Sequence, residues 1–420
     1  MSIVPTQLGD FASREGGPVP AAAVTPALLV IVGLSAFFTL ADLFGPHAIA
    51  PVLAHAFATS TPRIGVAINA AIAGMMTAGL LSSLFADRIG RKPAMVGALA
   101  LLAVPTALLA FCADLTVFEV LRIAQGFLMC VSFAVTIAYV AEEWGPSGAA
   151  PALMGAYLTG NVAANLFGRM IAGAVADFTD WRNAFVVFAA INLVGAGLLY
   201  LTLPASRRQP LKVDEPISIG LRNHLRNRAL CGAFGVGFLI LFTFVGIFTY
   251  VNFRLSQPPF GLSSGAIGLA YLVFAPAMLI TLLVGRTVQR FGYRTAFLLG
   301  SSVALVGCCL TLAGHLSLLL LGLAVIGSGL FFSQAVATGF TGHAAVGAKG
   351  AASGLYLAAY YAGGLCGAWV MGILFDSYAW VGCALAGVCA CSAMMIIVGL
   401  TWRASSGVVL GAVALPEPAE

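Results

Sequence analysis

Charged residues are scarce in this chain of 420 residues. Asp, Glu, Lys and Arg make up 8% of it, whereas soluble domains carry about 25%. Hydrophobic residues make up 60%, and the mean hydropathy is +1.01. A surface exposed to water cannot be built from this composition. The sequence therefore predicts a protein whose main solvent is lipid.

Other features are missing as well. The 20 Lys and Arg against 15 Asp and Glu reflect few charges of either sign rather than a basic face, which argues against a nucleic-acid partner. The nine cysteines lie in apolar runs, so we expect no disulfide framework. No basic stretch precedes the first apolar run, and we expect no cleaved signal peptide. No GxxxxGK[ST] loop or HExxH pair occurs, so we expect no enzyme, no cofactor and no ATP-driven transport by this chain alone.

Twelve apolar runs are long enough to cross a bilayer, whose core of about 30 Å requires about 20 apolar residues in a helix. The longest polar connection, residues 204–228, carries six basic and two acidic residues and divides the runs into six plus six. We expect an all-α membrane protein with a cytoplasmic tail (1–26), an N-terminal six-helix bundle (27–203), a cytoplasmic linker (204–228), a C-terminal six-helix bundle (229–402) and a second cytoplasmic tail (403–420).

Basic residues concentrate in alternate connections. With the N-terminus inside, the cytoplasmic segments hold 15 Lys and Arg, and the outer loops hold only Arg63, Arg182 and Arg254. Short basic loops stay on the cytoplasmic side. Both termini are therefore predicted to be cytoplasmic.

Two blocks recur in order along the chain, which indicates duplicated halves. The first block reappears 202 residues later, with Ser83, Asp87, Arg88, Gly90, Arg91 and Lys92 matching Gly285, Gln289, Arg290, Gly292, Tyr293 and Arg294. The second reappears 199 residues later, with Gly155, Tyr157, Gly168, Gly173, Asp177 and Trp181 matching Gly354, Tyr356, Gly367, Gly372, Asp376 and Trp380.

The segment Asp87-Arg-Ile-Gly-Arg-Lys92 and the pattern Arg122-x-x-Gln125-Gly126 resemble two signatures of the major facilitator superfamily. With the six plus six spans, the resemblance covers essentially the whole chain. It implies two pseudo-symmetric six-helix bundles that work by alternating access. The fifth run, which carries Gly160-Asn161, Gly168-Arg169, Gly173 and Asp177, resembles bacterial inner-membrane efflux-type members related to drug:proton antiporters.

The sequence departs from these patterns at two places. The loop signature normally opens with Gly, where this chain has Ser83. The drug exporters usually show Gly-Pro-x-x-Gly-Gly in the fifth span, where this chain has Gly160-Asn-Val-Ala-Ala-Asn165 without the proline. This second departure weakens antiport as an inference.

Three ionisable residues are candidates for proton coupling. A charge at the bilayer centre costs about 2.5 to 3.5 kcal/mol on insertion scales, so each needs a partner or a function. Helix rise places Asp42 and Arg122 at similar depths, which allows them to pair, and the resemblance gives Arg122 a part in proton coupling. His47 titrates in a suitable range. Structural alternatives stay open: a permanently paired Asp42, an Arg122 satisfied by Glu119, and a His47 that is a satisfied polar group at the Pro46 kink.

Polar and aromatic residues of two spans are candidates for substrate binding. Arg169 has no obvious acid on its own helix, so it points either to an anionic substrate or to helix packing. Asn161 and Asn165 lie on the same run and bind substrate if they face the cavity; otherwise they join helices. Tyr157 and Tyr356 occupy matching places in the repeats, with Tyr360 one turn further on, and they suit either a cavity for an aromatic solute or core packing.

The loop signature predicts a cytoplasmic gate. Asp87 and Gly90 belong to it, and its cations, Arg88, Arg91 and Lys92, can pair with Glu142 and Glu143 at the end of the fourth span. Arg290 is the matching cation of the second half, whose gate should be weaker because Gln289 replaces the acid. The alternative for the two glutamates is an ordinary solvated helix end.

The predicted function is proton-coupled export of a small amphipathic or aromatic organic compound across the bacterial inner membrane. In this mechanism Asp42 takes a proton from outside and Arg122 tunes the carboxylate. The alternative is a carrier of small organic anions that Arg122 and Arg169 hold. Minor alternatives are a soft-metal transporter and a membrane sensor that transports nothing. We expect a monomer that contacts membrane lipid, its solute and protons.

Overall fold

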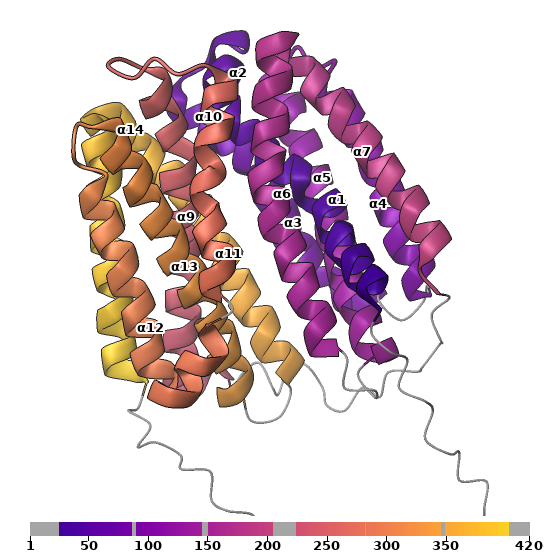
Figure 1. The fold of residues 1–420 in the computed structure, drawn as a ribbon, viewed down its shortest axis with the longest axis vertical. Helices are drawn as coiled ribbons and strands as arrows, with labels where there is room; N and C mark the ends of the chain where they lie inside the picture. The colour runs from indigo at the N-terminus through magenta and orange to yellow at the C-terminus, as the bar shows by residue number, and fades with distance from the viewer. Residues whose placement is uncertain are drawn as a thin grey trace, which may run out of the picture.

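The computed structural model describes residues 25–85, 90–144, 150–204, 224–281, 283–345 and 349–402, and all regular secondary structure in these ranges is helical. Figure 1 shows two groups of long helices lying side by side. The first group holds α1 to α7 and the second holds α9 to α14.

The helices of the first group are mostly long. They are α1 (Pro26–Ala48), the short α2 (Ala50–Ala56), α3 (Thr61–Phe85), α4 (Arg91–Leu109), α5 (Leu115–Trp144), α6 (Ala150–Phe178) and α7 (Trp181–Thr202). Thr25 caps α1 and accepts the Leu28 amide at 3.3 Å, with Pro26 at the first helical position, as is typical of helix starts. Asp180 caps α7 in the same manner.

The second group contains one broken span and two kinked helices. It consists of α9 (Arg228–Ser256), a broken span made of α10 (Ser264–Ala270), η1 (Tyr271–Phe274) and α11 (Ala275–Thr281), then α12 (Val284–Leu310), α13 (Leu316–Ala344) and α14 (Lys349–Thr401). Within α12, Gly292 has a φ of 76°. Within α14, Ala379 has a φ of 49° and divides 53 residues into two helices.

The predicted twelve spans each have a helical counterpart in the described residues. Eight helices are apolar and long enough to cross a membrane. The long helices α3 and α6, the broken span from α10 to α11, and the second helix within α14 complete the set. The predicted all-α fold with two six-helix bundles is confirmed. Gly292 and Ala379 lie where one predicted apolar run gives way to the next, whereas the interruption at η1 falls inside a run and was not predicted.

The two bundles repeat one helix contact. In the first, α1 packs on α6, and in the second, α9 packs on α14. A Cβ atom at Gly168 would collide with the carbonyl oxygen of Ala41, and one at Gly367 with that of Phe242. Gly168 and Gly367 are the matching glycines of the internal repeat. Small residues at these places let the helix backbones approach closely, as membrane helix pairs require.

The bundles touch each other near the predicted outer ends of their helices, where α6 meets α10 and α3 meets α14. Asp177 near the end of α6 accepts the Ser263 hydroxyl at 2.6 Å and the Gly265 amide at 2.8 Å. The Tyr250 ring of α9 fills the space beside Gly65 of α3 and Gly372 of α14, since a Cβ at either glycine would strike its hydroxyl. These contacts close one end of the interface, and a cavity lies further along it.

Candidate functional site

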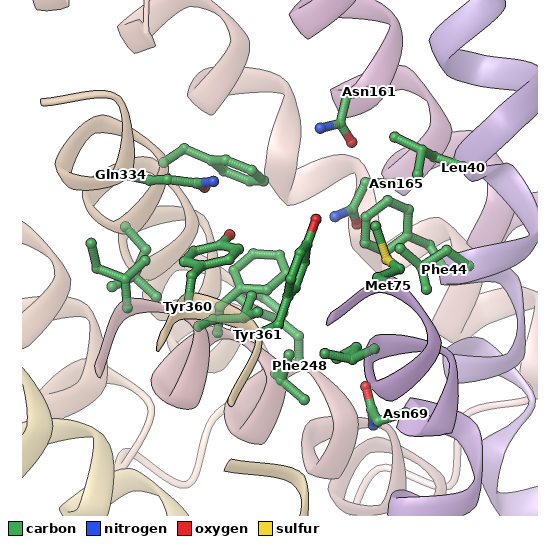
Figure 2. A pocket seen from close by; sticks show the side chains of 18 of the residues that line it. Leu40, Phe44, Asn69, Met75, Asn161, Asn165, Phe248, Gln334, Tyr360 and Tyr361 are labelled. Carbon is green, nitrogen blue, oxygen red and sulfur yellow. The ribbon is translucent and has the colours of Figure 1, made fainter. Parts of the chain in front are cut away.

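A central cavity lies between the two bundles. Helices α1, α3, α5 and α6 line it from one bundle, and α9, α13 and α14 from the other. Figure 2 shows Leu40, Phe44 and Asn69 on one side, facing Gln334 and Tyr360 on the other. Most of the lining is apolar or aromatic, with a few polar groups, which is typical of a site for a small organic molecule. The lining residues are Leu40, Leu43, Phe44, His47, Asn69, Ile72, Met75, Phe133, Asn161, Asn165, Arg169, Ile240, Leu241, Phe244, Val245, Phe248, Leu330, Phe331, Gln334, Leu357, Tyr360 and Tyr361.

Among the described residues, Arg169 is the one arginine that lines the cavity, and it is 1% exposed. Its guanidinium carbon lies 3.8 Å from the ring centroid of Tyr271 and 5.7 Å from that of Phe44. Its Nε and Nη1 atoms have no hydrogen-bond partner, and it forms no ion pair with any described residue. Aromatic faces stabilise a cation but leave its N–H donors unsatisfied.

Two asparagines and two tyrosines add polar groups to the cavity wall. Asn161 and Asn165 both lie in the lining, on the helix that carries Arg169. The Oδ1 atom of Asn165 is buried without a partner. Tyr360 and Tyr361 approach from α14, and in Figure 2 the Tyr361 hydroxyl points into the space toward Asn165. Together with Gln334, these groups offer both donors and acceptors to a solute.

His47 lies in the cavity wall and begins a hydrogen-bonded chain between the bundles. Its Nε2 atom lies 3.2 Å from Asn69 Oδ1, and Asn69 Nδ2 donates to Thr249 Oγ1 at 3.0 Å. Its Nδ1 atom lies 3.1 Å from the carbonyl oxygen of Phe44. The chain therefore links α1, α3 and α9.

Asp42 lies inside the first bundle and is not part of the cavity lining; it is fully buried. Its Oδ2 atom accepts hydrogen bonds from Thr106 Oγ1 at 3.0 Å, Asn192 Nδ2 at 3.1 Å and Gln125 Nε2 at 3.3 Å. Its Oδ1 atom has no partner. Three neutral donors thus hold one oxygen of the carboxylate and leave the other without a hydrogen bond.

Arg122 bonds to the backbone beside Asp42 rather than to its carboxylate. The Nη1 atom donates to the Asp42 carbonyl at 3.0 Å and to Gln125 Oε1 at 2.7 Å, and Nη2 donates to the Leu43 carbonyl at 3.2 Å. Nε and Nη2 both donate to the Ile68 carbonyl. The direct Asp42–Arg122 contact expected from helix rise is therefore replaced by a link through Gln125.

Pro46 leaves the backbone carbonyl oxygen of Asp42 free to accept a hydrogen bond from Arg122. In a regular helix that oxygen accepts the amide of the residue four positions later, and Pro46 has no amide hydrogen. The alternative in which Glu119 satisfies Arg122 is not observed. Glu119 Oε1 lies 3.9 Å from Arg63 Nη2 instead.

Two tyrosines predicted to bind substrate do not line the cavity. Tyr157 and Tyr356 are both buried, and their hydroxyls have no hydrogen-bond partner. Tyr157 packs edge-on against Phe133 and Tyr356 stacks on Tyr360, so each lies behind a residue of the wall. Helical periodicity identified the right helices but not their rotation.

The structure describes only some residues of the predicted gate. Arg91 forms an ion pair with Glu142 at 2.7 Å, and Lys92 Nζ donates to the Leu203 carbonyl at 2.5 Å. Both contacts lie within the first bundle, so in this conformation they do not tie the two bundles together. Gly90 precedes α4 as its N-cap, and Arg290 lies 5.3 Å from the Phe291 ring. Asp87 and Arg88 lie outside the described residues, and Glu143 makes an interaction of its own.

Sequence reasoning assigned no role to several residues of the site. Asn69, Asn192 and Gln334 are polar residues within apolar runs, and that isolation is a signal that marks them as candidates. Gln125 is part of the Arg122-x-x-Gln125-Gly126 pattern, but only Arg122 was predicted to have a role. The aromatic lining had no sequence signal, since the chain has 28 Phe. Among the described residues, no group of three His, Cys, Asp or Glu side chains could hold a metal ion.

Comparisons with known proteins agree on one family. A model of the Major Facilitator Superfamily matches residues 32–281. The inner membrane transport protein YnfM of Escherichia coli (strain K12) is 31% identical over 364 residues, covering 86% of this chain and 86% of that protein. The multidrug transporter MdfA of Edwardsiella ictaluri (strain 93-146) is 26% identical, covering 83% and 85%. The solved structure of the nucleoside transporter NupG has a TM-score of 0.74 at 13% identity, covering 90% of this chain and 99% of that chain, and it supports the fold alone.

Proposed function

Because the chain belongs to the major facilitator superfamily, and is thus a multi-pass membrane transporter, we propose that it exports a small organic anion with an aromatic or other apolar body. The site is the central cavity, which alternating access exposes to one side of the membrane at a time. This combines the two functions predicted from the sequence: an amphipathic or aromatic solute, and an anion held by a buried arginine. The multidrug activity in the name of MdfA is consistent with export of such solutes.

The observation that carries the proposal is the unpaired Arg169 guanidinium. A buried cation with unsatisfied donors is costly until an acceptor of opposite charge reaches it. The described lining contains no Asp or Glu, so a carboxylate or similar group on the solute would supply that charge. The aromatic wall, including Phe248 and Tyr361, would contact the apolar body. A cationic solute is disfavoured, because it would meet Arg169 without a compensating acid.

Proton coupling is proposed to run through Asp42, Gln125 and Arg122. When Asp42 gains a proton, its interaction with the Gln125 amide weakens, and Gln125 is also bonded to Arg122. Arg122 in turn holds the carbonyls of Asp42 and Leu43 on α1. Since Leu43 lines the cavity, the state of the carboxylate is transmitted to the cavity wall through one helix. This makes Asp42 a coupling residue that never needs to touch the solute.

Binding by purified protein tests the solute class. We expect aromatic carboxylates to raise the thermal unfolding midpoint and the matching neutral amides to have little effect. Loss of a charge-assisted hydrogen bond costs about 1.5 to 3 kcal/mol, so Arg169→Met should weaken carboxylate binding by about 10- to 150-fold. Arg182→Gln, at the exposed start of α7, is the matched control and should bind normally. Equal stabilisation by carboxylates and amides, or wild-type affinity in Arg169→Met, would reject the anion.

A further inference from the structure

A second recess lies at the predicted cytoplasmic end of the second bundle, away from the central cavity. It lies between the start of α9, the first part of α12, the end of α13 and the end of α14. Arg228, Arg294 and His343 line it, and its described lining includes no Asp or Glu. A basic recess between helix ends at this depth is suited to an anion.

Two buried N–H groups in the recess lack acceptors. Arg294 donates from Nη2 to the Gly399 carbonyl at 3.1 Å, but its Nε atom is buried without a partner. Trp402 is 2% exposed and its ring stacks on Phe340 with centroids 3.8 Å apart, yet its Nε1 atom has no partner. Leaving such donors unsatisfied in a buried place is unfavourable. Both belong to residues that line the recess, so an acceptor group bound there could satisfy them.

In the first bundle, the donors at the matching place are bonded to backbone carbonyl groups. Lys92, the repeat counterpart of Arg294, donates to the Leu203 carbonyl at 2.5 Å. Beside it, the Tyr139 hydroxyl donates to the Pro204 carbonyl at 2.7 Å. In the second bundle Arg294 also donates to a carbonyl of the corresponding helix end, that of Gly399. Trp402, at the repeat position of Leu203, adds an indole N–H, and this donor and Arg294 Nε have no acceptor among the described residues.

We propose that this recess binds the phosphate of an anionic phospholipid head group. A guanidinium suits phosphate oxygens in charge and geometry. Leu400 lines the recess and is 69% exposed at the end of a membrane-spanning helix, so the recess opens beside the surface that acyl chains cover. Its depth at the helix ends matches the head-group layer. This site is separate from the proposed transport cavity and does not depend on the transported solute.

Lipid titration of the purified full-length protein in detergent tests the site. We expect dioctanoyl-phosphatidylglycerol to raise the thermal unfolding midpoint saturably, whereas dioctanoyl-phosphatidylcholine and inorganic phosphate at equal concentration do not. Arg294→Gln should weaken the apparent affinity for phosphatidylglycerol about tenfold. Trp402→Phe, which keeps the stacked ring and removes only the N–H, should weaken it about threefold.

Arg182→Gln at the opposite end of the molecule controls for a general loss of positive charge, and it should bind the lipid as the wild type does. The proposal is overturned if both Arg294→Gln and Trp402→Phe retain wild-type affinity for phosphatidylglycerol. It is also overturned if Arg182→Gln loses as much affinity as they do. Equal stabilisation by inorganic phosphate would likewise overturn it, because the site would then serve a soluble phosphate rather than a lipid.

Discussion

Three buried ionisable residues have different environments, and each environment suggests a different role. Arg122 satisfies all five of its N–H groups with protein oxygens. Asp42 satisfies one carboxylate oxygen. Arg169 is packed against aromatic rings, and its Nε and Nη1 atoms have no hydrogen-bond partner. The sequence could predict that these residues matter, because charge in apolar spans is costly. It could not predict which of them meets the cavity, since that depends on helix rotation.

Asp42→Asn is expected to uncouple transport from the proton gradient. The amide has the shape of the carboxylate, and its oxygen can accept the bonds from Thr106 and Asn192, so the variant should fold. Accumulation driven by a pH gradient should fall to near background in proteoliposomes, while solute exchange at equal pH continues. Undiminished gradient-driven transport by this variant would remove Asp42 from the mechanism.

Arg122→Lys is expected to destabilise the protein although charge is conserved. A lysine ammonium has three donors on a flexible stem and cannot replace a planar group that reaches the carbonyls of Asp42, Leu43 and Ile68 at once. Carbonyls left without a donor cost about 1 to 3 kcal/mol each. The thermal unfolding midpoint in detergent should fall, and an unchanged midpoint would show that these bonds contribute little.

At the scale of whole helices, the contacts of α1 with α6 and of α9 with α14 depend on small residues. The apolar runs predicted the spans, and the repeat predicted that Gly168 and Gly367 have matching places. The broken span at η1 could not be predicted, because apolar residues continue through it. Breaks of this kind are stabilised by neighbouring helices rather than by local sequence.

Gly168→Ala is expected to separate α1 from α6, since the added methyl group would strike the Ala41 carbonyl. Overpacking of this kind costs about 1 to 3 kcal/mol, which should lower the unfolding midpoint. Gly155→Ala on the same helix is the control, because nothing lies within 4 Å of a Cβ there, and it should be neutral or slightly stabilising. Equal effects of the two substitutions would contradict the contact.

Asp177→Asn is expected to favour opening at the predicted outer end. The carboxylate accepts a hydroxyl and an amide across the interface between α6 and α10, and an amide oxygen accepts them more weakly. Because Asp177 is exposed, we expect only a shift of about threefold in the ratio of open to closed forms. Distances between spin labels on the outer ends of the two bundles would report it, with Asp180→Asn as the exposed control.

At the scale of the whole molecule, two similar bundles enclose a cavity that neither could form alone. The sequence predicted this architecture from the count of spans and the two repeated blocks. It did not predict the chemical character of the cavity, because the lining combines side chains from seven helices that lie far apart in the chain. The proposed solute class therefore rests on the three-dimensional structure.

The outer closure has a consequence for each transport cycle. Tyr250 is wedged between glycines of both bundles, and its hydroxyl donates to the Ala368 carbonyl at 2.5 Å. If the bundles separate here, Gly65 moves away from this phenol, while Gly372, carried on the same half as the ring, stays beside it. The Tyr250 ring would then line one side of the gap between α3 and α9.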